Sequence, residues 1–69
     1  MRKILLEKRT DYWAAWFYGV ARMPEDVELP LPYHSSAPLS VIAEHMRKRF
    51  AFNYLFYRNS LGDLSHVET

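Results

Sequence analysis

The three histidines are the side chains of this sequence best suited to metal binding or acid–base chemistry. They are His34, His45 and His66, and no two of them are spaced to share one face of a helix. The chain contains no cysteine, which removes thiolate metal sites and disulfides together. The sequence therefore predicts no metal centre and no other cofactor.

Acidic and glycine patterns give little support for catalysis. Glu44 and His45 are adjacent and so face different directions on a helix. Asp26 and Glu28 lie in an acidic stretch without a predicted pocket that would shift their pKa values. Only two glycines are present, too few for a glycine-rich phosphate loop. We therefore predict that the protein is not an enzyme.

The strongest local charge feature is the basic run Arg47–Arg49, which His45 precedes and Arg58 follows. Such a run suits phosphates or an acidic protein surface. Three successive helical residues spread over roughly half the circumference, however, so a solvated face partly paired with Glu44 is the simpler interpretation. The net charge of +1 gives no general attraction to nucleic acid or to an anionic membrane.

The elements that must position these side chains are predicted to be two helices. The longer one covers 37–61; its first half is amphipathic, and its second half is apolar on almost every side. The shorter one covers 11–23, where aromatic residues recur at helical spacing before Pro24 ends the helix. The expected fold is all-α, a helix–long loop–helix protomer in a single small domain over residues 1–69.

The remaining segments are predicted to be an arm, a connection and a tail. Residues 1–9 form the N-terminal arm, in which Ile4–Leu6 is either extended or an extra helical turn. The proline-rich connection 24–36 is expected to be stiff and extended. An edge strand there has no obvious partner unless Ile4–Leu6 pairs with it. The polar tail 62–69 is expected to fray.

The two predicted helices leave apolar surface uncovered, and this predicts a dimer. The shorter helix covers the main stripe of the longer one, but a second set of apolar side chains points away from that stripe. A small chain without disulfides or a metal is usually stabilised by oligomerisation. We predict an intertwined helical homodimer; the alternative is that the connection covers the second set within one chain. The predicted dimer interface consists of Val41, Phe52, Leu55 and Phe56.

Aromatic side chains beside the basic run form the predicted partner-binding surface. Their helical spacing is more typical of core packing than of base stacking. Cations that steer an encounter and aromatics that hold the complex are common in protein–protein hot spots. We therefore expect a non-enzymatic inhibitor that occupies the functional surface of a larger protein. The predicted partner-binding residues are Arg47, Arg49, Phe52, Tyr54, Tyr57 and Arg58, together with Tyr18 and Arg22.

The segment LSVIAEHM, residues 39–46, is similar to the first helix of a helix-turn-helix DNA reader. The similarity stops at Arg47, where such motifs turn and this sequence continues without a turn signal. A small DNA-binding regulator is therefore kept as an alternative, as is a structural subunit of a larger complex. Nucleic acid is not the expected partner.

In size and two-helix layout, the chain resembles the phage quorum-sensing anti-activator family. The resemblance covers the length, the predicted helices Asp11–Met23 and Leu39–Leu61, and the basic-aromatic segment Arg47–Tyr57. It implies a compact helical dimer that binds the LuxR-type regulator LasR, keeps it from DNA, and also binds the type IV pilus assembly ATPase PilB. No family motif marks individual binding residues in this sequence.

The N-terminal segment MRKILLEKR bears on where the protein works. Its apolar run is too short for a secretory signal, and the sequence contains no stretch long enough to span a membrane. The expected location is the cytoplasm, which for a phage-encoded protein is the host cytoplasm, and the lack of cysteine agrees with it.

Overall fold

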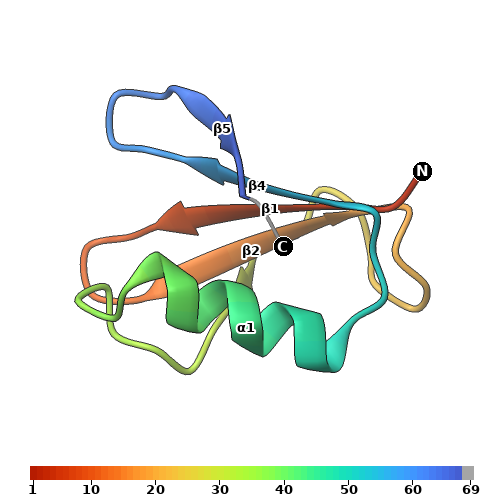
Figure 1. The fold of residues 1–69 in the computed structure, drawn as a ribbon, viewed down its shortest axis with the longest axis horizontal. Helices are drawn as coiled ribbons and strands as arrows, with labels where there is room; N and C mark the ends of the chain where they lie inside the picture. Colours follow the sequence, from red (N-terminus) through yellow and green to blue (C-terminus); the bar gives the residue numbers. More distant parts are fainter. Residues whose placement is uncertain (68–69) are drawn as a thin grey trace.

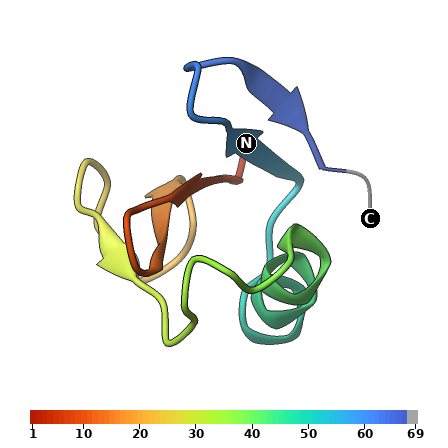
Figure 2. The same cartoon turned by 90° about the vertical axis from the view of Figure 1, so that its left-hand side faces the viewer.

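A mixed β-sheet with one helix packed against it forms this protein. The structure is a computed structural model and describes residues 1–67. The elements in chain order are β1 (Lys3–Lys8), β2 (Trp13–Tyr18), β3 (Leu29–Pro30), α1 (Leu39–Arg49), β4 (Tyr54–Arg58) and β5 (Leu64–His66). The helix lies on one side of the sheet, and the β4–β5 hairpin rises away from it (Figures 1 and 2).

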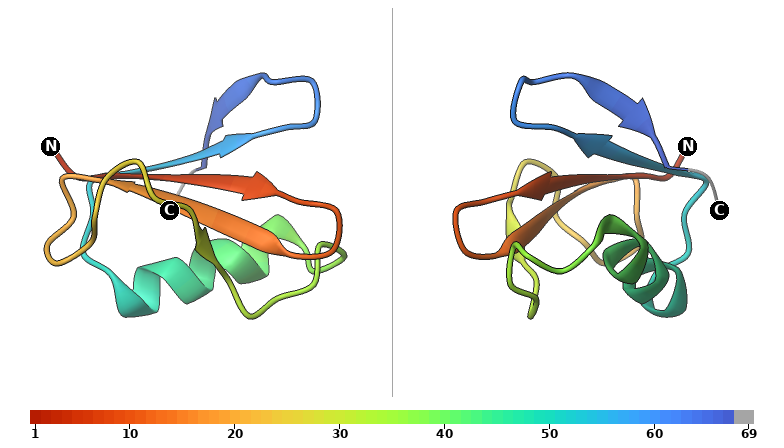
Figure 3. Two further views of the ribbon diagram at one scale, coloured as in Figure 1. Left: turned by 180° about the vertical axis from the view of Figure 1, so that it is seen from behind. Right: turned by 60° about the vertical axis from the view of Figure 1, so that its left-hand side comes forward.

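The strand order is β3-β2-β1-β4-β5, so the N-terminal strand is the centre of the five-stranded sheet. β1 pairs antiparallel with β2 and parallel with β4, and the two outer pairs are antiparallel. A parallel neighbour requires a long connection, because the chain must return to the end of the sheet at which it started. Here the connection from β1 runs through β2, β3 and α1 before the chain enters β4 (Figure 3).

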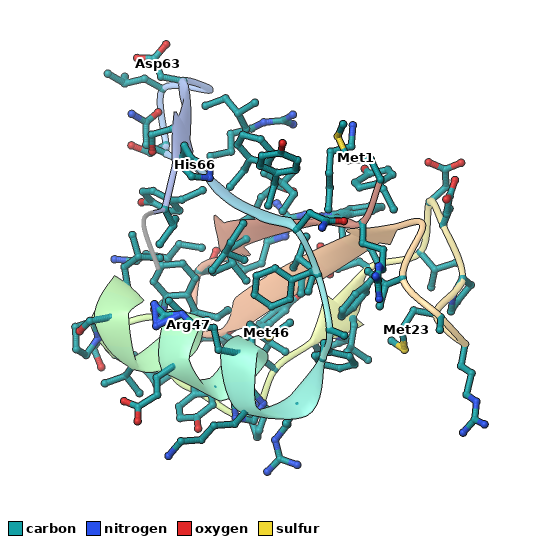
Figure 4. The ribbon with its side chains drawn as sticks, turned by 45° about the vertical axis from the view of Figure 1, so that its right-hand side comes forward. Met1, Met23, Met46, Arg47, Asp63 and His66 are labelled. Atoms are coloured by element: carbon teal, nitrogen blue, oxygen red, sulfur yellow. The ribbon has the colours of Figure 1, made fainter. Side chains whose placement is uncertain are left out.

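Alternation along the strands divides the side chains between two faces of the sheet. The face covered by α1 carries Ile4, Leu6 and Leu55, all with 0% exposure. The helix contributes Ile42 and Met46 to the same core, and Met46 points from α1 to the sheet (Figure 4). This face therefore supplies the main hydrophobic core.

Two aromatic contacts tie the connecting segments to this core. The Trp13 indole Nε1 donates a hydrogen bond of 3.0 Å to the carbonyl oxygen of Ala37, just before the helix. The Phe17 ring lies 4.9 Å from the ring of Phe50, just after the helix. Both ends of α1 are thus held by side chains of β2.

The predicted all-α fold is wrong, and β2 shows why. Residues 13–18, WAAWFY, form a strand where a helix over 11–23 was expected. Apolar residues occupy both alternating sets of positions in this segment, and four of its six residues are buried. The pattern therefore fits the period of a helix as well as that of a strand. The strand is stabilised because all of its residues pair with β1, and aromatic residues also favour the strand conformation.

The predicted helix over 37–61 is only half a helix. α1 ends at Arg49, and Phe50 is extended, with φ −132° and ψ 146°. The basic last turn Arg47–Arg49 complements the negative end of the helix dipole, which is typical of a helix C-terminus. The aromatic segment beyond it forms β4, in which Leu55 faces the core and its neighbours face away.

The arm, the connection and the tail each contain a strand, so the extended alternative for Ile4–Leu6 agrees with the structure. The predicted arm 1–9 contains β1, and the connection 24–36 contains β3, which pairs with β2 rather than with Ile4–Leu6. Gly19 ends β2 with φ +71°, and a Cβ there would lie 2.7 Å from the Met1 carbonyl oxygen. The predicted tail 62–69 contains β5, and its last two residues lie outside the described residues.

The intertwined helical dimer loses its structural basis. Leu55 is completely buried within one chain, and Phe52 packs partly against the same core. Val41, 40% exposed, lies on the outer side of α1, whereas Phe56 faces the opposite side of the sheet. These four residues therefore do not form one interface.

Candidate functional site

The sheet face opposite α1, called the open face below, gathers aromatic and aliphatic side chains from four strands. The register places Leu5 of β1 between Trp16 of β2 and Phe56 of β4, and Phe56 beside His66 of β5. Residues opposite one another in adjacent strands share a face. The side chains of the open face include Leu5, Trp16, Tyr18, Tyr54, Phe56, Leu64 and His66, with the charged residues Lys3, Glu7 and Arg58.

A groove of about 200 Å³ lies on this face, and we call it the sheet groove. Leu5, 8% exposed, is among its buried residues. The residues that line it are Lys3, Ile4, Leu5, Tyr18, Phe56, Arg58 and Leu64. Sites for drug-sized ligands measure about 300–1,000 Å³. The sheet groove is therefore better matched to side chains of another molecule than to a whole small ligand.

Aromatic rings continue from the sheet groove toward β5. Tyr54, 40% exposed, and Phe56 are stacked with their ring centroids 6.3 Å apart. His66 approaches the Phe56 ring edge-on at 5.5 Å and the Tyr54 ring at 6.0 Å. Such contacts hold the rings in place, and a rigid aromatic surface loses little conformational entropy on binding.

The charges on the open face favour an anionic ligand or partner. Lys3 and Arg58 both line the sheet groove. Glu7 lies on the same face but is shared between Arg9, at 3.4 Å, and Arg58, at 3.8 Å. Lys3 and Arg58 together outnumber this carboxylate, so the face presents a net positive charge.

The sequence-predicted binding residues fall into separate places. Tyr18, Tyr54 and Arg58 lie together on the open face, as does Phe56 from the predicted dimer interface. Arg47 and Phe52 lie elsewhere, in a groove of about 420 Å³ at the end of α1. We call this second site the arginine groove; its lining residues are Arg2, Arg47, Phe50, Ala51, Phe52 and Asn53.

The other predicted binding residues join neither groove. Tyr57 faces the helix side of the sheet, with its ring 5.7 Å from that of Trp13. Arg22 is exposed in the turn after β2, where its φ is +67°. Arg49 lines a hollow on the outer side of α1, together with Val41 and His45. The residues predicted to form one binding surface therefore lie in several separate places.

His45 is the titratable group with the most distinctive surroundings in that hollow. Its Nδ1 shares a hydrogen bond of 3.0 Å with the Tyr33 hydroxyl, and the two rings meet edge-on at 5.0 Å. Burial lowers the pKa of His45 below its ordinary value, and the nearby Arg49 guanidinium lowers it further. The imidazole is therefore neutral at neutral pH, which suits a hydrogen bond that orders the connection against α1.

A second polar cluster joins the β1–β2 turn to the segment before β3. Glu28 accepts hydrogen bonds from Arg9 Nε, at 2.7 Å, and from the Tyr12 hydroxyl, at 2.9 Å. The Arg9 hydrogen bond lowers the pKa of Glu28, to which Tyr12 also contributes. The same contacts raise the pKa of Arg9 and that of Tyr12. This cluster fixes a loop and offers no carboxylate with a raised pKa for acid catalysis.

Residues 1–67 contain no group of three or more His, Cys, Asp or Glu side chains placed to hold a metal ion. Within that range there is also no helix with the length and apolar character to cross a membrane.

Sequence reasoning missed four residues of the sheet groove: Lys3, Ile4, Leu5 and Leu64. The first three were assigned to an arm and the fourth to a tail. The signal that could have found Lys3 and Leu5 is the period of two in KILLEK, which places both on one side of their strand. The same period in YLFYR places Tyr54 and Phe56 on one side of the other strand. Only the pairing of β1 with β4 shows that these are the same face.

Comparison with known proteins gives no relative for this chain. No protein-family model matches it, and no curated protein or solved structure is significantly similar to it.

Proposed function

We propose that the protein is a non-enzymatic binding module that holds a partner protein on the open face of its sheet. The observation that carries this proposal is the sheet groove, which is lined by both apolar and charged side chains: Leu5, Tyr18 and Phe56 together with Lys3 and Arg58. Tyrosine and arginine are among the residue types that dominate protein–protein hot spots. Contiguous apolar surface on a small protein is typical of an interface.

The charges point to the chemistry of the partner. A second copy docked face to face would bring two faces of the same net positive charge together, and Glu7 is already engaged by Arg9 and Arg58. A different protein, with carboxylates that meet the two cations and an apolar side chain that enters the sheet groove, satisfies both features. We therefore propose an acidic partner protein rather than a homodimer.

The resemblance to phage anti-activators no longer supports a particular target. It was based on two helices, and residues 11–23 and the second half of 37–61 are strands and loops instead. A LuxR-type regulator and a pilus ATPase stay predictions, as does a cytoplasmic location. The helix-turn-helix alternative is weakened likewise, because α1 is the only helix in the described part of the chain.

The test compares two double variants with the same change of charge. Lys3→Gln/Arg58→Gln neutralises the open face, and Lys48→Gln/Arg49→Gln neutralises the outer side of α1. Each tagged protein is used for affinity purification at low and moderate salt, followed by mass spectrometry. We expect an acidic protein that the wild type and the helix variant recover and the open-face variant loses, with recovery falling as salt rises.

Several outcomes would contradict the proposal. Equal recovery by both variants would place the contact away from the open face. Recovery that nuclease treatment abolishes would indicate nucleic acid. A wild-type mass twice that of one chain, reverting to one chain in the open-face variant, would show that a second copy covers this face.

A further inference from the structure

The arginine groove lies where three segments meet: the residue before β1, the end of α1 and the loop into β4. Arg47 is in the last turn of the helix and is exposed, whereas its neighbour Met46 is buried and points toward the sheet (Figure 4). Arg2 is held through its backbone. Its N–H donates to Asn53 Oδ1 at 3.0 Å, and its carbonyl oxygen accepts from the Asn53 and Tyr54 N–H groups at 2.8 and 3.1 Å. Both cations are thus attached to ordered backbone.

The groove combines positive charge with aromatic walls. No carboxylate lines it, and within residues 1–67 neither Arg2 nor Arg47 forms an ion pair. Lys48, by contrast, pairs with Glu44 at 3.1 Å. Phe50 and Phe52 are partly exposed, and the contact of Phe50 with Phe17 fixes one wall. The two guanidinium groups therefore stand beside two rings without a protein anion to neutralise them.

We propose that the arginine groove binds a nucleotide unit, with its phosphate on Arg2 and Arg47 and its base against Phe50 or Phe52. Planar guanidinium groups match the oxygens of phosphate and form charge-assisted hydrogen bonds with it. Bases stack on aromatic side chains independently of their sequence. At about 420 Å³, the groove has the size of a small-ligand site. This site shares no residue with the sheet groove, so either proposal can fail alone.

The experiment follows the amide NMR signals of the full-length protein during titration with AMP, inorganic phosphate and a short single-stranded oligonucleotide. We expect AMP to shift the signals of Arg2, Arg47 and Phe52 most. Arg47→Gln should weaken AMP binding by about tenfold, because it removes a charged hydrogen-bond donor. Lys48→Gln is the matched control, since it makes the same charge change one residue away outside the groove, and its affinity should be unchanged.

A ring variant separates the base from the phosphate. Phe52→Leu keeps an apolar wall but removes the stacking surface, so it should weaken AMP while leaving phosphate unchanged. Tighter binding of the oligonucleotide than of AMP would identify a strand as the source of the nucleotide, and equal binding would identify the free nucleotide. Phosphate binding as tightly as AMP would overturn the nucleotide proposal. So would an AMP affinity that Arg47→Gln leaves unchanged, or no shift at millimolar AMP.

Discussion

The two faces of the sheet are built from the same strands but differ in how far their side chains are buried. On the helix side, Ile4, Leu6 and Leu55 are fully buried against α1. On the open face, the residues between them and beside them include Tyr54, 40% exposed, and Leu64, 56% exposed. Both faces are rich in apolar side chains, yet only one is covered within the described residues. The helix side therefore supplies most of the buried core, and on our proposal the open face is the side that binds a partner.

Adjacent residues of β2 test this division most directly. Phe17 is 1% exposed on the helix side, and its neighbour Tyr18 lines the sheet groove. Phe17→Ala should cost about 3–5 kcal/mol, because it leaves a cavity beneath Phe50. That is comparable with the whole stability of a small domain, so much of this variant should be unfolded. Tyr18→Ala should cost about 1 kcal/mol and leave the fold intact.

Urea denaturation followed by circular dichroism measures both free energies of unfolding. Phe17→Leu, which leaves a smaller cavity, provides a folded reference if Phe17→Ala does not fold. Equal losses for Phe17→Ala and Tyr18→Ala would mean that the two faces share the stability of the protein. In that case the open face would be part of the core and a poor candidate for partner binding.

The two tryptophans of β2 sharpen the same comparison. Trp13 donates its Nε1 hydrogen to the Ala37 carbonyl oxygen, whereas the buried Nε1 of Trp16 has no hydrogen-bond partner among the described residues. Trp13→Phe should cost about 2 kcal/mol, since it loses a hydrogen bond and core volume. Trp16→Phe removes an unsatisfied donor together with some apolar area, so its effect should stay within about 0.5 kcal/mol. Each variant leaves a single tryptophan, and thermal unfolding followed by its fluorescence compares the two positions.

Several features of this fold could be predicted from the sequence. The amphipathic pattern that begins near Leu39 correctly indicates a helix whose buried face contains Ile42, Ala43 and Met46. Glycine can also mark a close contact with another backbone, and at Gly19 a Cβ would lie 2.7 Å from the Met1 carbonyl oxygen. These features depend on local pattern and on the residues present, which a single sequence contains.

The division between the two faces could not be predicted in this way. In WAAWFY, helical spacing places Trp13, Trp16 and Phe17 together, whereas the strand places Trp16 opposite the other two. Apolar residues at every position satisfy both patterns, so the local sequence does not choose between them. The choice is made by β1, which binds β2 on one side and β4 on the other. The sheet groove depends on that long-range pairing, because its residues come from positions 3 to 64.

A smaller effect than that of Trp13→Phe is expected at Glu28, whose hydrogen bonds with Arg9 and Tyr12 join two connecting segments outside the core. The pKa of Glu28 is lower in the folded protein than its ordinary value, chiefly because of the Arg9 hydrogen bond. The cluster should therefore contribute its full stability above the pKa of glutamate in the unfolded chain and lose it as the pH falls through the lower folded pKa. Because this contact is partly exposed, Glu28→Gln should reduce stability at neutral pH by about 1 kcal/mol or less and make little difference at strongly acidic pH.

Thermal unfolding of the wild type and Glu28→Gln across the acidic range measures this difference. Glu44→Gln is the control, since it removes another glutamate whose exposed pair with Lys48 lies on the outer side of α1. If the difference in thermal stability between wild type and Glu28→Gln does not narrow toward low pH, the carboxylate charge is not what stabilises the loop. If Glu28→Gln lowers stability as much as Phe17→Ala does, the Glu28 hydrogen bonds contribute as much to the stability of the fold as the helix-covered core.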